Sequence, residues 1–231
     1  MTVIENNYRC RVKICGVTRE EDVDAVCAAG ADYIGFLVNI NSPRSNTPDR
    51  AAALARRAAA PTVLLFLDAA TDLIFNRTMQ AEPAAIQLHG DEPPQTVKLL
   101  RRTGAEIWKA LHIPMAGAGA APTAESLLNS INDYVTAGAD KILLDTVVTS
   151  GEDRKTGGTG KIHDWNLAAE IVRRAPCPVI VAGGITPENS AAAVRAVHPY
   201  SLDVSSGVER SKGVKDTAKI QSLIANVKSV V

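Results

Sequence analysis

One short junction occurs three times along this chain of 231 residues, and it constrains the fold more than any other feature. It reads AAGADYIGF at residues 28–36, RTGAEIWKAL at 102–111 and TAGADKILLD at 136–145. In each copy a helix-like segment ends at a glycine, the residue that favours a left-handed helix cap, and an acidic residue and an apolar run follow. The sequence therefore predicts three helix-to-strand turns of the same design.

Strand-like runs and segments of helical periodicity alternate along the whole chain. The runs lie near RVKIC, YIGFLV, TVLLFL, AAIQLH, IWKAL, KILLD, PVIVA and SLDVS. Eight such units over this length predict a single α/β domain, residues 1–231, folded as a closed (β/α)8 TIM barrel. An open doubly wound sheet is the alternative, but no GxGxxG motif follows the first strand. Helix starts are predicted at Thr18 with Glu21, at Thr47-Pro48 and at Thr186-Pro187.

Charge and composition exclude several classes of protein. Lysine plus arginine equals aspartate plus glutamate at 25 each, so no global field attracts nucleic acid or an anionic membrane. The N-terminus lacks the apolar core of a signal peptide, and no apolar run approaches the roughly 20 residues that span a bilayer. We therefore expect a cytoplasmic protein without nucleic-acid or membrane partners. The cysteines form no zinc pattern and no His/Asp/Glu group has ligand spacing, so no metal or cofactor is predicted; the cysteines are Cys10, Cys15, Cys27 and Cys177.

The active site of such a barrel lies at the carboxyl ends of its strands, where two glycine- and serine-rich segments stand out. Gly183 and Gly184 end the seventh predicted strand, and Ser205, Ser206 and Gly207 end the eighth. Backbone N–H groups and hydroxyls there predict a phosphate site, and hence a phosphorylated small-molecule substrate. Alternatively, Gly183-Gly184 is only a tight turn before the helix.

Asp145 and Cys15 are the candidate acid and base. Asp145 follows an apolar run, so partial burial would raise its pKa and make it a general acid, although capping of the next loop is the alternative. Strand alternation turns Lys13 and Cys15 into the barrel. Cys15 is then either a base, if nearby positive charge lowers its pKa, or a small apolar plug. Lys13 needs a partner inside the barrel, and parity predicts Asp203.

Further polar residues follow other strands. Arg44, after the second strand, either binds a carboxylate through two nitrogens of its guanidinium group or is a solvated loop residue. Gln87 and His89 end the fourth predicted strand, and His89 is a candidate hydrogen-bonding group at the rim. The segment GEDRKTGGTGK, residues 151–161, is polar and glycine-rich and predicts a mobile lid that contains Gly158.

Taken together and in this order, eight motifs resemble the phosphoribosylanthranilate isomerase family of tryptophan biosynthesis over nearly the whole chain. They are KICGVT, IGFLVNINSPR, AIQLHGDE, IWKAL, ILLDT, GGTGKIHDW, VIVAGGITPENS and DVSSGVERSKGVKD. The resemblance implies an Amadori rearrangement of N-(5-phosphoribosyl)anthranilate, with Asp145 as general acid and Cys15, as thiolate, as general base.

The same resemblance implies how the substrate is held. Arg44 would bind the anthranilate carboxylate, and the segments at residues 183–184 and 205–207 would surround the phosphate. We also expect substrate contacts from Gln87, His89, Gly158 and Asp203. Two positions depart from the family pattern, His163 before Asp164-Trp165 and Leu67-Asp68 after the third strand, and the Ala/Gly-rich loop after the fifth strand is unusual.

Two other functions remain open at this point. A related sugar-phosphate aldose-ketose isomerase would act on a different aromatic or amine group, as the histidine-pathway enzyme does; that family carries aspartate where Cys15 stands. A barrel that only binds a phosphorylated metabolite is the second alternative. The sequence leaves the oligomeric state open between monomer and homodimer.

Overall fold

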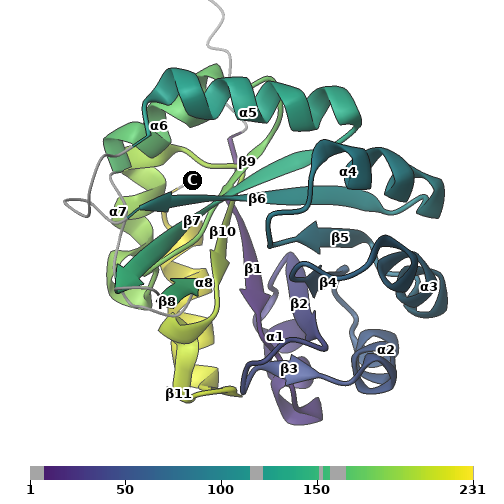
Figure 1. Cartoon of the computed structure of the whole chain (residues 1–231). Helices are drawn as coiled ribbons and strands as arrows, with labels where there is room; N and C mark the ends of the chain where they lie inside the picture. The colour runs from purple at the N-terminus through teal and green to yellow at the C-terminus, as the bar shows by residue number, and fades with distance from the viewer. Residues whose placement is uncertain (1–7, 115–121, 151–152, 157–164, 231) are drawn as a thin grey trace, which may run out of the picture.

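The computed structural model describes residues 8–114, 122–150, 153–156 and 165–230, and the strands of these ranges close into a parallel barrel (Figure 1). The barrel strands are β1 (Arg11–Cys15), β2 (Tyr33–Val38), β4 (Thr62–Phe66), β5 (Ala85–Leu88), β6 (Glu106–Pro114), β7 (Lys141–Ser150), β9 (Val179–Val181) and β10 (Ser201–Val204). Closure is direct, because β1 pairs in parallel with both β2 and β10. The predicted (β/α)8 barrel is confirmed, and the open-sheet alternative is wrong.

Helices follow the strands and lie around the outside of the barrel (Figure 1). They are α1 (Glu20–Ala29), α2 (Pro48–Arg57), α3 (Thr71–Ala81), α4 (Pro94–Leu100), α5 (Ala124–Ala137), α6 (Trp165–Arg174), α7 (Pro187–Val197) and α8 (Thr217–Lys228). In the described ranges, no helix has the length and apolar character needed to cross a membrane.

Two of the three predicted helix starts are confirmed. The Thr47 hydroxyl accepts a hydrogen bond from the Arg50 N–H at the start of α2, and the Asn189 side chain accepts one from the Thr186 N–H at the start of α7. The start at Thr18 is wrong. Helix α1 begins at Glu20, and the Thr18 hydroxyl instead donates to the Gly213 carbonyl at 2.9 Å.

Short elements that the sequence did not predict lie between the barrel strands and helices, and all but the 3-10 turn that follows α4 come after the carboxyl end of a barrel strand. These are β3 (Ser45–Asn46) beside β2, β8 (Asp153–Thr156) antiparallel to β7, the β11–β12 hairpin (Glu209–Ser211 and Val214–Lys215), and the 3-10 turns η1 (Arg101–Thr103) and η2 (Ser206–Val208).

The repeated junction has the predicted geometry and a further function. Gly30, Gly104 and Gly138 all have left-handed φ angles, of 78°, 79° and 106°. The aspartate after two of these glycines reaches the neighbouring strand: Asp32 accepts from the Val12 N–H at 2.9 Å, and Asp140 accepts from the Ile107 N–H at 2.8 Å. The Gly-Ala-Asp pattern thus ends a helix and also ties the new strand to the one beside it.

Lys13 lies inside the barrel with no exposed surface, as strand parity predicts, while Val12 and Ile14 join the core beneath the helices. Its Nζ lies 2.9 Å from Asp203 Oδ2 on β10 and 2.9 Å from Gln87 Oε1 on β5. The predicted Lys13–Asp203 contact is confirmed, and three strands of the barrel meet at this ammonium.

We expect Lys13→Met to lower the free energy of unfolding by about 3–5 kcal/mol, because it leaves the Asp203 carboxylate buried without its cation. Urea unfolding measures the change. The double variant Lys13→Met/Asp203→Leu removes both charges and should recover much of the loss. A single variant as stable as the wild type would contradict the prediction.

Candidate active site

Cys15 lies at the carboxyl end of β1, directly above Lys13. It is 4% exposed and pairs with Gly35 on β2. A Cβ atom built on Gly35 would lie 2.9 Å from Cys15 Sγ and 3.1 Å from Lys13 Nζ, so the thiol and the ammonium share the space above this glycine. Burial raises the pKa of the Cys15 thiol; Lys13 lowers it, but the net shift is upward. The positive charge of Lys13 is present beside Cys15, as the sequence predicts, but burial has the larger effect on the pKa of the thiol.

Asp145 lies on β7, 3% exposed, and both of its carboxylate oxygens are engaged. Oδ1 accepts from the Thr146 N–H at 2.8 Å, and Oδ2 lies 3.3 Å from His89 Nε2. Burial raises the pKa of Asp145, but the hydrogen bond from His89 lowers it, and the net shift is downward. The predicted upward shift is wrong, because the sequence revealed the apolar neighbours of Asp145 but not its hydrogen-bond donor.

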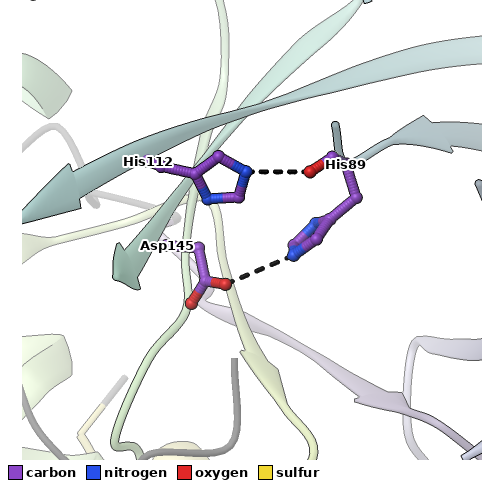
Figure 2. Close-up of side chains that lie close together, drawn as sticks. All are labelled: His89, His112 and Asp145. Atoms are coloured by element: carbon purple, nitrogen blue, oxygen red, sulfur yellow. Dashed lines mark hydrogen bonds and ion pairs between the residues drawn. The ribbon is translucent and has the colours of Figure 1, made fainter. Parts of the chain in front are cut away.

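Figure 2 shows Asp145 together with His89, which follows β5, and His112, which lies on β6 beside it. His112 Nε2 lies 2.8 Å from the His89 carbonyl oxygen. One ligand atom from each of the three side chains lies within 4.8 Å of the others, which is a possible arrangement for a metal ion. This cluster could not be recognised from the sequence because its members come from three separate segments of the chain.

Arg44 lies at the mouth of the barrel beside Gly16, where it binds Glu209 with both atoms of one edge of its guanidinium. Nε and Nη2 each lie 2.8 Å from a Glu209 carboxylate oxygen. Lys215 Nζ lies 3.1 Å from the same carboxylate and also donates to the Ser205 carbonyl. Glu209 therefore holds the Nε/Nη2 edge of Arg44 in place, and the solvated-loop alternative is wrong.

The segments after β9 and β10 pack closely against each other. A Cβ atom on Gly207 would lie 1.9 Å from the Ile185 carbonyl oxygen, and one on Gly183 would lie 2.2 Å from Thr146 Oγ1. The Ser205 hydroxyl is buried and has no hydrogen-bond partner among the described residues. Gly184 also forms the turn before α7, because its carbonyl accepts from Asn189 Nδ2. The two interpretations of Gly183-Gly184 are therefore compatible.

Residues 12–226 match the protein family described as N-(5'phosphoribosyl)anthranilate (PRA) isomerase. The chain belongs to this isomerase family. An N-(5'-phosphoribosyl)anthranilate isomerase from Thiobacillus denitrificans is 42% identical over 222 residues, which cover 95% of this chain and 98% of that protein. The isomerase class predicted from the sequence is confirmed; the residue roles stay predictions.

Solved structures of phosphoribosylanthranilate isomerases have the same fold. A monomeric form of the dimeric enzyme from Thermotoga maritima superposes with a TM-score of 0.77 at 29% identity, covering 95% of this chain and 98% of that one. An isomerase in complex with reduced 1-(o-carboxyphenylamino)-1-deoxyribulose 5-phosphate gives the same TM-score and identity, covering 95% and 99%.

Glu209 and Lys215 also line the candidate site, although the sequence did not identify them as candidates. Both stand in the motif DVSSGVERSKGVKD and are paired across the β11–β12 hairpin, where they are buried in contact with Arg44 and Ser205. Burial lowers the pKa of Lys215, while the Glu209 carboxylate raises it, and the net shift is downward. The available signal was the density of charge in that motif, which holds three acidic and three basic residues.

Other predicted residues lie below the rim or outside the described ranges. Gln87 is fully buried, with its amide oxygen on Lys13 and its amide nitrogen on His89, so it contacts residues of the site. Asp68 turns toward the neighbouring loop, where its carboxylate accepts from the Asp91 N–H at 2.7 Å. Gly158 and His163 lie outside the described residues, as does most of the predicted lid; its part at 153–156 is strand β8.

Proposed function

We propose that Asp145 and Cys15 are the acid and base with which this isomerase converts N-(5-phosphoribosyl)anthranilate to 1-(2-carboxyphenylamino)-1-deoxyribulose 5-phosphate, a step of tryptophan biosynthesis. One observation carries the assignment. The two side chains are both buried near the mouth and are joined by contacts through Lys13, Gln87 and His89. Asp145 on β7 and Cys15 on β1 thus both lie at the interior of the barrel.

The reaction needs one proton donor and one proton acceptor. Asp145 gives its proton to the ring oxygen of the ribose, the C1–O bond breaks, and an iminium forms between C1 and the anthranilate nitrogen. Cys15, as thiolate, removes the proton on C2, and the electron pair of that bond forms the C1=C2 bond of an enolamine. Protonation at C1 and loss of the enol proton then give the ketone.

We further propose that two cationic or polar regions hold the ends of the substrate. The Nη1/Nη2 edge of Arg44 binds the anthranilate carboxylate, since Glu209 already fixes the other edge. Residues 183–184 and 205–207 surround the phosphate, and the buried hydroxyl of Ser205 supports this assignment. We also propose that His89, Asp203 and Gly158 contact the substrate. Gln87 lies beneath the rim, where its amide contacts Lys13 and His89.

The protonation states of the ligand-free protein differ from those that the reaction uses. With a lowered pKa for Asp145 and a raised one for Cys15, the dominant form carries a carboxylate and a thiol. The reactive form, with acid and thiolate, has the same number of protons, so the ratio of the two forms does not depend on pH between the two pKa values.

The test follows the loss of anthranilate-type fluorescence when the purified protein receives freshly made substrate, with kcat/KM measured across pH. We expect turnover and a broad plateau. The acidic limb should lie below pH ~4, because the pKa of Asp145 is lowered, and the alkaline limb above pH ~8.5, because that of Cys15 is raised. The groups that face Asp145 are His89, His112 and the Thr146 N–H; those that face Cys15 are Lys13, Asp203, Lys215 and Arg44.

His89→Ala identifies the acidic limb. It removes the hydrogen bond that lowers the pKa of Asp145 and leaves the burial that raises it, so the limb should move to higher pH. The substrate phosphate titrates near pH ~6, and a limb there that His89→Ala leaves in place belongs to the substrate. An inert wild-type protein, or a narrow optimum that no variant moves, would contradict the proposal.

Two wider features are also proposed. A biosynthetic isomerase acts on a diffusible phosphorylated metabolite, so we propose that the chain works in the cytoplasm. We propose that it is either a monomer or a homodimer, as the relative from Thermotoga maritima is described as dimeric. Sedimentation velocity distinguishes these two states.

A further inference from the structure

A continuous chain of polar contacts crosses the inside of the barrel from β10 to β7. Asp203 Oδ2 lies 2.9 Å from Lys13 Nζ, which lies 2.9 Å from Gln87 Oε1. Gln87 Nε2 lies 3.0 Å from His89 Nδ1, and His89 Nε2 lies 3.3 Å from Asp145 Oδ2. Each link therefore restricts which atom of the next residue donates and which accepts.

The donor-to-acceptor direction of this series of contacts follows from the ammonium of Lys13. An ammonium group only donates, so the atom of Gln87 that faces it is the amide oxygen. The amide NH2 of Gln87 then faces His89 Nδ1, and since this group only donates, Nδ1 accepts and carries no proton. The ring proton of His89 is therefore on Nε2, where it donates to Asp145 Oδ2.

We propose that Gln87 is a positioning residue that, anchored by Lys13, holds His89 in its Nε2–H tautomer and thereby orients Asp145. With Thr146 N–H on Oδ1 and His89 Nε2–H on Oδ2, the plane of the Asp145 carboxylate is fixed. The tautomer assignment stands on the contacts alone. Its effect on catalysis rests on the role proposed for Asp145.

The same tautomer works against metal binding at the cluster of His89, His112 and Asp145. A histidine that binds a metal through Nε2 has no proton there, and its Nδ1–H normally donates to a carboxylate or carbonyl. At His89 the group facing Nδ1 is a donor, the NH2 of Gln87. The contacts therefore favour a hydrogen bond between His89 and Asp145 over a shared metal ion.

Nitrogen-15 NMR of the histidine rings tests the proposal in the wild-type protein and in Gln87→Glu. The wild type should have a protonated Nε2 and an unprotonated Nδ1 at His89. In Gln87→Glu the new carboxylate accepts from Lys13 and from the ring, so a proton should appear on Nδ1. Gln80→Glu, the same substitution at an exposed position on α3, should leave His89 unchanged, and the exposed His198 should give the same signals in all three proteins.

Two further readouts separate a specific effect from general damage. We expect Gln87→Glu to lower kcat by roughly tenfold or more with little change in KM, as a wrong histidine tautomer does in other acid–base sites. Zn²⁺ added alone should shift the His89 signals in Gln87→Glu and not in the wild type. Unchanged His89 signals in the variant would contradict the proposal that Gln87 sets the tautomer of His89.

The outcomes distinguish this inference from the proposed reaction. A proton on His89 Nδ1 in the wild type, or wild-type His89 that binds Zn²⁺, overturns the inference even if the enzyme is active. The predicted tautomer in a protein that does not turn over N-(5-phosphoribosyl)anthranilate supports the inference and overturns the proposed function. Because the first measurement uses the wild type, poor folding of Gln87→Glu leaves the test intact.

Discussion

Asp145→Asn is expected to lower kcat by roughly 10²–10⁴-fold, the range that a positioned proton donor contributes. An amide has the shape of the carboxyl group but cannot pass a proton to the ribose ring oxygen. Its oxygen can still accept from His89 Nε2–H, which keeps residue 145 beside His89, although its NH2 group then faces the Thr146 N–H and that hydrogen bond is lost. The loss should therefore appear in kcat with little change in KM.

Asp140→Asn is the matched control, because it makes the same change directly before the amino end of the strand that carries Asp145. Asp140 accepts from the Ile107 N–H and binds Arg101, far from the mouth of the barrel. We expect this variant to lose stability and keep kcat. If Asp145→Asn retained more than about a tenth of the wild-type kcat, Asp145 would not be the general acid.

The fold and the inner wall of the site could be predicted because both depend on local patterns. A glycine after a helix followed by an apolar run gives a helix-to-strand turn, and alternation along a short strand gives the facing of each side chain. Closure of the barrel then brings the first and last strands together, which was enough to pair Lys13 with Asp203. No long-range information beyond closure was needed for this contact.

The electrostatics of the site could not be predicted because they depend on neighbours from distant segments. The sequence places apolar residues before Asp145 and so suggests a raised pKa, whereas the hydrogen bond from His89 reverses the shift. Similarly, Arg44 is bound by Glu209, 165 residues further along the chain, once the β11–β12 hairpin has formed. Burial of a side chain can be inferred from the sequence pattern, but a partner that comes from a loop or hairpin, as for Asp145 and Arg44, can be identified only in the folded chain.

Cys15→Ser is expected to lower kcat/KM by roughly 10²–10⁴-fold, because a serine hydroxyl is far too weak an acid to supply the anionic base that a thiolate supplies. The substitution changes the volume little, so it separates the two interpretations that the sequence left open. An apolar plug would tolerate serine with a modest loss of stability, whereas a general base would not. The alkaline limb of the pH profile should also disappear, since it belongs to the thiol.

Cys10→Ser provides the comparison that makes this argument decisive. Cys10 and Cys15 are each 4% exposed, but Cys10 packs in the core beneath the helices while Cys15 adjoins Lys13 inside the barrel. Both variants bury a hydroxyl in place of a thiol and should lose similar stability in urea unfolding. If only Cys15→Ser loses activity, the difference is due to the position of the thiol beside the ammonium; if both keep full activity, Cys15 is a plug and another group removes the C2 proton.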